Sequence, residues 1–225
     1  MGLSTKDVKS GSDSNFVNKT IQPGNIEAKL NNIELHQPPF LEADSGYYLC
    51  LNLETTKPTD DFEGFLIDKD DPSKGKYEGQ VGRVKASKWP YKDGTTKSGI
   101  EISRDNEMMK VMKSLCEALK LMTWWKKVDQ KYNTIEEFIE GFNNEAPFKD
   151  KYIHFCVCGR EYYNKAGYIA YDVYLPKYSK DGVGFSKDEE KVIAFSPDRH
   201  IEYAEKPVQV EGFGKSNDVP TEFEL

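Results

Sequence analysis

Residues 25–37 read NIEAKLNNIELHQ, and their apolar side chains alternate along the chain with one interruption. Ile26, Ala28 and Leu30 are two residues apart, and the alternation resumes at Ile33 after two asparagines. A period of two places side chains on one face of a β-strand, and a single slip in that period is typical of a β-bulge. The stretch therefore predicts a long, bent first strand over 25–37.

The segment that follows carries further strand patterns. Residues 46–55, GYYLCLNLET, alternate strictly, and a short apolar run covers 62–67. Residues 79–89 and 95–103 flank Lys-Asp-Gly, and Asp-Gly supplies the positive φ that tight hairpin turns require. We expect a second strand, a short third strand and an extra hairpin.

A helical block and more strands complete the pattern. Apolar residues recur every three or four positions to about Trp124, which predicts a helix that Ser103 or Asp105 can cap. Thr134 and Glu137 form a capping box for a second helix that ends near Phe142. Three alternating segments then predict three strands: YIHFCVC from 152, EYYN from 161 and GYIAYDVYL from 167.

The order of strands, helices and strands is that of an OB-fold, in which five strands close a small barrel. The predicted fold class is therefore mainly β with inserted helices: an OB-fold-like five-stranded barrel with an extra hairpin and a helical block between strands 3 and 4. An open α+β sheet is the competing arrangement. The predicted organisation is a flexible segment over 1–20, a single domain over 21–205 and a flexible acidic tail over 206–225.

Composition limits the cellular setting. The net charge is −7, and 31% of the 225 residues are charged. No run approaches the roughly 18–20 apolar residues of a membrane span, and the N-terminus lacks the apolar core of a signal peptide. Four cysteines are too few for a disulfide framework. We expect a cytoplasmic protein with reduced thiols and no membrane partner.

Positive charge is nevertheless concentrated in one region. Residues 69–97 contain eight basic and four acidic side chains, a net charge of +4. Exposed rings among cations stack unpaired bases while the cations neutralise phosphates, although a lysine-rich hairpin can also simply protect a sheet edge. The predicted nucleic-acid-binding residues are Arg83, Lys85, Lys88, Trp89, Tyr91, Lys92 and Lys97, joined by Arg160, Tyr162 and Tyr163 on the later strands.

The sequence offers little chemistry for catalysis. His154, Cys156 and Cys158 share one face of a strand, but without a second pair of ligands a buried strand face is the favoured interpretation. The acidic residues near 60–71 could belong to a metal-dependent nuclease, because two-metal catalysis needs clustered carboxylates. A solvated acidic loop without catalytic function is the favoured interpretation. No phosphate-binding loop or nucleophile motif is present. We predict no enzyme, no cofactor and no metal site.

The C-terminal end has a composition of its own. Residues 201–225 contain six acidic and two basic side chains, a net charge of −4. Acidic segments with apolar anchors suit capture by a basic pocket on another protein. The predicted partner-binding residues are Asp218, Glu222, Phe223 and Leu225.

Four segments carry a family resemblance: PGNIEAKLNNIELHQPPF, YYLCLNLET, DFEGFLIDKDDPSKGKYEGQVGRVKAS and DGTTKSGIEISRD. They resemble single-stranded DNA-binding proteins of crAss-like gut bacteriophages over about residues 21–116. The resemblance implies an OB-fold, a role in phage DNA replication or recombination, and the cytoplasm of a bacterial host. The tail resembles those of bacterial single-stranded DNA-binding proteins but lacks their aspartate run and final Phe.

The combined interpretation is a sequence-tolerant single-stranded DNA-binding protein that stacks bases on aromatic rings and holds phosphates with Lys and Arg. Replication or recombination proteins are the expected partners of the tail. The alternative is a protein-interaction or virion-associated structural module that binds no nucleic acid.

Overall fold

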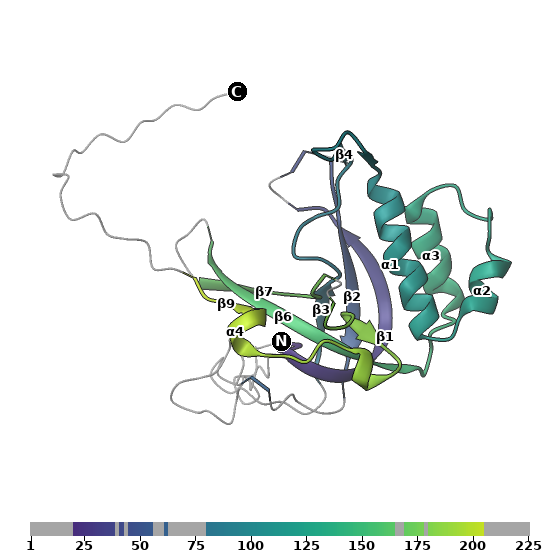
Figure 1. The fold of residues 1–225 in the computed structure, drawn as a ribbon. Helices are drawn as coiled ribbons and strands as arrows, with labels where there is room; N and C mark the ends of the chain where they lie inside the picture. Colours follow the sequence, from purple (N-terminus) through teal and green to yellow (C-terminus); the bar gives the residue numbers. More distant parts are fainter. Residues whose placement is uncertain are drawn as a thin grey trace, which may run out of the picture.

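The computed structural model describes residues 20–38, 41–42, 45–55, 61–62, 80–164, 169–177 and 180–204. Within these ranges the protein is a closed β-barrel with helices packed against one side (Figure 1). The five barrel strands are β1 (Gly24–His36), β2 (Tyr48–Glu54), β3 (Val81–Lys85), β6 (Tyr152–Tyr163) and β7 (Ile169–Tyr174).

The strand order is that of an OB-fold. The strands follow one another as β1-β2-β3-β7-β6, and β6 pairs with β1 to close the barrel. The β3–β7 pair is parallel, whereas the other pairs around the barrel are antiparallel. The predicted OB-fold-like barrel with helices between its strands is confirmed.

The first strand closes the barrel because it is bent. Gly24 to Lys29 pair with β6, and the rest of β1 pairs with β2. The register shifts between Leu30 and Asn32, so the predicted bulge is confirmed. The Asn52 amide donates a 2.5 Å hydrogen bond to Asn32 just past the bulge. A bulge bends a strand, which lets one strand serve two neighbours.

The helical block covers the barrel and shares its core. Leu49, Leu51 and Leu53 of β2 are fully buried together with Met112 and Phe142 of the helices. The helices are α1 (Arg104–Ala118), α2 (Met122–Lys127) and α3 (Ile135–Glu145).

The predicted helix caps are present, but the predicted length of the first helix is wrong. Ser103 and Thr134 accept hydrogen bonds from the amides of Asn106 and Glu137. The first helix ends at Ala118, because Lys120 has a left-handed backbone with φ of 56°. Trp124 therefore lies on α2, where its ring packs edge-on against the aromatic rings of α3.

The predicted hairpin between 79–89 and 95–103 is wrong. The first arm is instead the third barrel strand, β3, which lies between β2 and β7. The second arm folds on itself as β4 (Gly94–Thr95) and β5 (Glu101–Ile102). The hairpin turn lies not at Asp93 but after Thr96, where the Gly99 amide donates to the Thr96 carbonyl and Gly99 has a φ of 83°. The Asp93 carboxylate accepts a hydrogen bond from the Arg104 amide at the start of α1. The expected short strand at 62–67 lies outside the described residues from 63 onward, and Phe62 is not in a strand.

The later strands also differ from the prediction. Residues 152–158 and 161–164 were expected as two strands, but β6 runs through Gly159 without a break. Gly159 pairs with Val173 on one side and with Ile201 on the other, so ladders on both sides hold the glycine extended. The remaining elements are β8 (Phe185–Ser186), η3 (Glu189–Lys191), α4 (Pro197–His200) and β9 (Ile201–Glu202).

The two predicted terminal segments are almost entirely absent from the described residues. The flexible segments predicted over 1–20 and 206–225 fall outside the described residues except for residue 20.

Within the ranges that the structure does cover, none of the helices combines the length and apolar character that crossing a bilayer requires.

Candidate functional site

A cavity of about 1020 Å³ opens where the barrel wall meets the extended β6–β7 hairpin. The wall contributes residues of β1, β2 and β3, the residues that flank β1 and a residue beyond β3, and the hairpin contributes its outer half. The residues that border the cavity are Thr20, Ile21, Gln22, His36, Pro38, Tyr48, Gly82, Arg83, Lys85, Trp89, Arg160, Tyr162, Tyr163, Asn164, Tyr171, Asp172 and Val173.

Six of the ten predicted nucleic-acid-binding residues border this one cavity. They come from two segments far apart in the chain, and the parallel β3–β7 pair brings those segments together. The six are Arg83, Lys85, Trp89, Arg160, Tyr162 and Tyr163.

The other four predicted residues lie elsewhere. Tyr91 is half-buried against the core and its backbone pairs with that of Tyr47, and burial raises the pKa of Tyr91 to about 12. Tyr91 is therefore part of the barrel wall. Lys92 and Lys97 are exposed at the base and tip of the β4–β5 hairpin. Lys88 is next to Trp89 but does not line the cavity.

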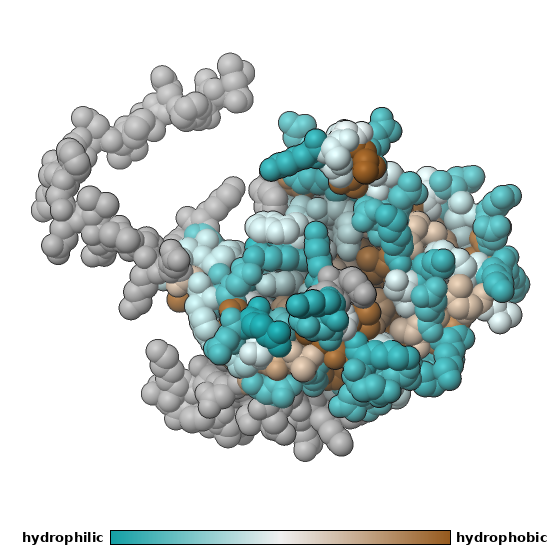
Figure 2. Space-filling view, in the orientation of Figure 1, coloured by the Kyte–Doolittle hydropathy of each residue, from teal (hydrophilic) through white to brown (hydrophobic). Residues whose placement is uncertain are grey.

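The β4–β5 hairpin projects from the barrel. Ile100 is 65% exposed on it, and Figure 2 shows hydrophobic surface where Figure 1 places this hairpin. Lys97, between the two strands of this hairpin, is not among the residues that border the cavity.

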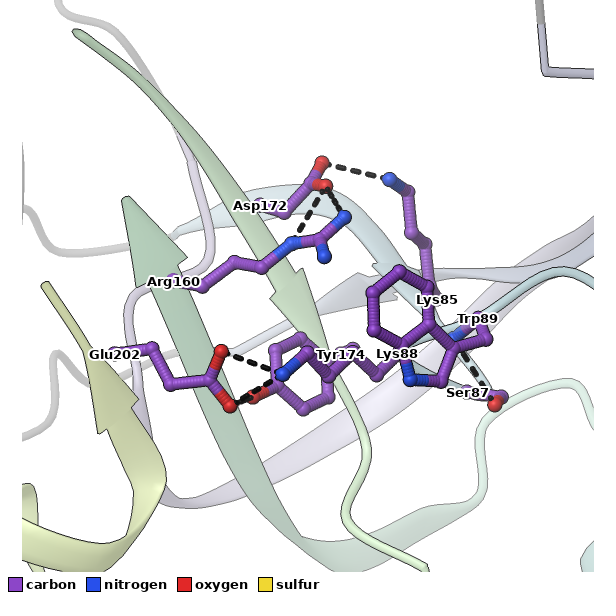
Figure 3. Close-up of polar contacts among 8 residues, drawn as sticks. All are labelled: Lys85, Ser87, Lys88, Trp89, Arg160, Asp172, Tyr174 and Glu202. Atoms are coloured by element: carbon purple, nitrogen blue, oxygen red, sulfur yellow. Dashed lines mark hydrogen bonds and ion pairs between the residues drawn. The ribbon is translucent and has the colours of Figure 1, made fainter. Parts of the chain in front are cut away.

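Trp89 is the most exposed ring at the cavity. The residue is 58% exposed and lies four positions beyond the end of β3, where its amide donates to the Ser87 hydroxyl at 3.3 Å. The Arg160 guanidinium carbon and Lys88 Nζ each lie 5.2 Å from the centre of the Trp89 ring. The expected combination of an exposed ring and adjacent cations is present (Figure 3).

Asp172 holds two of the cations together. Lys85 Nζ lies 2.7 Å from one carboxylate oxygen, and Arg160 Nη2 lies 2.8 Å from the other (Figure 3). All three side chains are at most 18% exposed. Burial opposes ionisation of Asp172, but the hydrogen bonds from Lys85 and Arg160 outweigh it and lower the pKa of this carboxyl group.

The neighbouring cations also have acidic partners. Lys88 contacts Glu202 of β9 at 2.5 Å, and the Tyr174 hydroxyl lies 3.3 Å from the same carboxylate. Arg83 contacts Glu34 of β1 at 2.5 Å. These pairs lower the net positive charge that the sequence alone suggested for this surface.

The local sequence patterns did not predict the acidic partners of these cations. Asp172 belongs to an otherwise apolar and aromatic strand, and a charge in such a strand is a usable signal that a partner exists. The identity of the partner depends on the β6–β7 register, in which Arg160 is directly opposite Asp172.

The candidate metal-binding residues regroup in the folded chain. Cys156 and Cys158 are buried as predicted, but His154 is only half-buried and pairs with Ser186 of β8. Across the described residues, the ligand atoms of Cys156, Cys158 and His200 lie within 4.8 Å of one another. His154 is replaced in this group by a histidine distant in sequence.

Two other predicted features fall largely outside the described residues. Of the acidic segment near 60–71, Asp61 is described, and its carboxylate accepts a 2.7 Å hydrogen bond from the Asn25 amide. The tail residues Asp218, Glu222, Phe223 and Leu225 all lie outside the described ranges.

Comparison with known proteins assigns no family to the chain. No protein-family model matches the sequence, and neither the curated proteins nor the solved structures provide a match.

Proposed function

We propose that this protein binds single-stranded DNA without strong sequence preference, through the cavity between the barrel wall and the β6–β7 hairpin. The observation that carries the proposal is Trp89, an exposed ring at the rim of a cavity bordered by Arg83, Lys85 and Arg160. Every base has a face that stacks on an aromatic ring, so such a site tolerates any sequence.

The aromatic and charged groups have separate tasks in this proposal. Trp89 and Tyr162, which are 58% and 39% exposed, offer ring surface to unpaired bases. Arg83, whose side chain is 45% exposed, is the cavity-lining cation most accessible to phosphate. A paired duplex keeps its base faces stacked inside the helix, so base stacking on protein rings favours single strands.

A cellular role follows from the proposed activity and the resemblance to phage proteins. We infer that the protein acts in phage DNA replication or recombination in the cytoplasm of a bacterial host. The acidic tail, with Phe223 and Leu225, would recruit replication or recombination proteins to DNA that the barrel holds.

The proposal is tested by fluorescence anisotropy with single-stranded DNA, duplex DNA and RNA oligonucleotides at several salt concentrations. We expect single-stranded DNA to bind more tightly than duplex DNA. Each phosphate contact should contribute about −0.7 to the slope of log affinity against log salt, so four contacts give about −3. Equal affinity for duplex and single strands, or no binding to either, would contradict the proposal.

A charge variant makes the salt experiment specific to the cavity. Arg83→Gln should weaken binding and reduce the magnitude of the slope by about 0.7, because one phosphate contact is lost. Lys126→Gln, an exposed site on α2, removes the same charge outside the cavity and should leave the slope unchanged. An unchanged slope in the Arg83 variant would remove Arg83 from the phosphate path.

A protein-interaction or virion-associated structural module is the second candidate function. The observation that favours it is the pairing of Arg83, Lys85, Lys88 and Arg160 with carboxylates, which leaves less free positive charge for DNA. Absence of DNA binding at low salt by a folded protein would support this candidate.

A further inference from the structure

Two thiols and an imidazole meet on the side of β6 that faces away from the barrel interior. Phe155 and Val157 belong to the main core, so the alternation of the strand places Cys156 and Cys158 on the opposite face. His200 is the last residue of α4 and immediately precedes β9, which pairs in parallel with β6. The ladder places Ile201 beside Gly159, and so brings His200 close to the two cysteines.

This group lies in an apolar setting of its own. Cys156 packs with Val192 and Ile193 in a small cluster separate from the main core, with Phe195 against it. Both cysteines are free thiols, with exposed fractions of 0% and 2%. None of the three residues borders the cavity assigned above to DNA.

We propose that Cys156, Cys158 and His200 bind one zinc ion that ties β9 to β6. Two thiolates and an imidazole are preferred zinc ligands, and three protein ligands leave one tetrahedral position for solvent. Zinc–sulfur and zinc–nitrogen distances of about 2.3 and 2.0 Å bring ligand atoms to within about 4 Å of one another. The three ligand atoms, which lie within 4.8 Å of one another, therefore need to move together only slightly to reach these distances.

The imidazole must turn to take part. His200 Nδ1 accepts a 2.9 Å hydrogen bond from the Ser196 amide, so the neutral ring carries its proton on Nε2. Rotation of the ring gives up one hydrogen bond at the short helix α4. The free energy lost with this hydrogen bond is small compared with the free energy gained from two metal–thiolate bonds.

The consequence of metal binding would reach the rim of the cavity. Glu202 lies two residues after His200 and pairs with Lys88, the neighbour of Trp89. A zinc ion that holds β9 against β6 would thus hold Glu202 in place beside Lys88. The metal site itself does not depend on whether the cavity binds DNA.

The test uses the full chain, reduced with a phosphine, stripped with a chelator and then titrated with zinc chloride or cobalt chloride. We expect one zinc per chain after dialysis, and a thiolate-to-cobalt charge-transfer band with Co²⁺. Zinc in large excess over its Kd should raise the Tm by about 5 °C or more, because it binds the folded state. A chain that retains no zinc and shows no cobalt–thiolate band would overturn the proposal.

Variants identify the ligands. His200→Gln and Cys158→Ser should each weaken zinc binding by roughly 100-fold or more, because each removes a ligand. His154→Gln, on the same strand, and Cys50→Ser, at another buried thiol, should bind zinc as the unmodified chain does. His200 is only half-buried, so its variant remains informative if a cysteine variant fails to fold. Undiminished zinc binding by folded His200→Gln would overturn the proposed ligand set.

Discussion

Replacing Trp89 with alanine is expected to weaken single-stranded DNA binding by about 1–3 kcal/mol, the usual effect of removing one stacking ring. This corresponds to roughly 5- to 150-fold in Kd. The exposed Trp89 ring has few core contacts to lose, so stability should change little. Anisotropy titrations measure the affinity, and thermal unfolding followed by circular dichroism verifies the fold.

A second exposed ring provides the control for Trp89. Tyr152 is 43% exposed at the other end of β6 and does not border the cavity. Tyr152→Ala removes an exposed aromatic ring without touching the proposed site, and it should leave DNA affinity unchanged. If Trp89→Ala also binds normally while folded, Trp89 is not a stacking platform and the proposed binding surface is wrong.

Asp172→Asn is expected to change stability and DNA binding in opposite directions. The asparagine retains the shape of the side chain but loses the charge that Lys85 and Arg160 contact. Hydrogen bonds to charged groups contribute about 1.5–3 kcal/mol, and the free energy of unfolding should fall by about that amount. The two released cations should strengthen DNA binding at low salt by roughly 1 kcal/mol, because a competing negative charge has left the cavity.

The two effects are measured separately, by urea unfolding and by anisotropy. Glu107→Gln is a suitable control, since it breaks the exposed ion pair with Lys110 on α1, and exposed pairs contribute little. Weaker DNA binding by folded Asp172→Asn would mean that the carboxylate positions Arg160 for binding rather than competing with phosphate.

The same pair of cations predicts a pH dependence of stability. The pKa of Asp172 is lower in the folded protein than in the unfolded chain, so the unfolded chain takes up this proton first as pH falls. The contribution of Asp172 is therefore complete above the unfolded pKa of about 4 and is lost as pH falls through the lower folded pKa. Asp172→Asn should accordingly lose less stability than the unmodified protein between pH 7 and pH 3.

Local patterns predicted the parts of this protein that depend on neighbours in the chain. Alternating apolar residues identified β1, with its bulge, and β2, because the side-chain period of a strand is visible in sequence. Thr134 was predicted as a cap and Ser103 as one of two candidates, since a cap bonds an amide only three residues away. These local elements were enough to indicate a barrel of the OB type.

Pairing between distant segments had to come from the tertiary structure. Residues 81–85 form a barrel strand rather than a hairpin arm because β2 and β7 both bond to them, and no local pattern records those partners. Tyr91 is likewise part of the barrel wall because its backbone pairs with that of Tyr47, which is distant in the sequence.

Composition and local pattern thus determined the fold class and the residue types of the candidate site, whereas strand register decided which charges and ligands meet. The register of β6 with β7 sets Arg160 opposite Asp172, and that of β6 with β9 brings His200 to Cys158. The physical reason is that hydrogen-bonded ladders position residues by their place across a sheet and not by their separation along the chain.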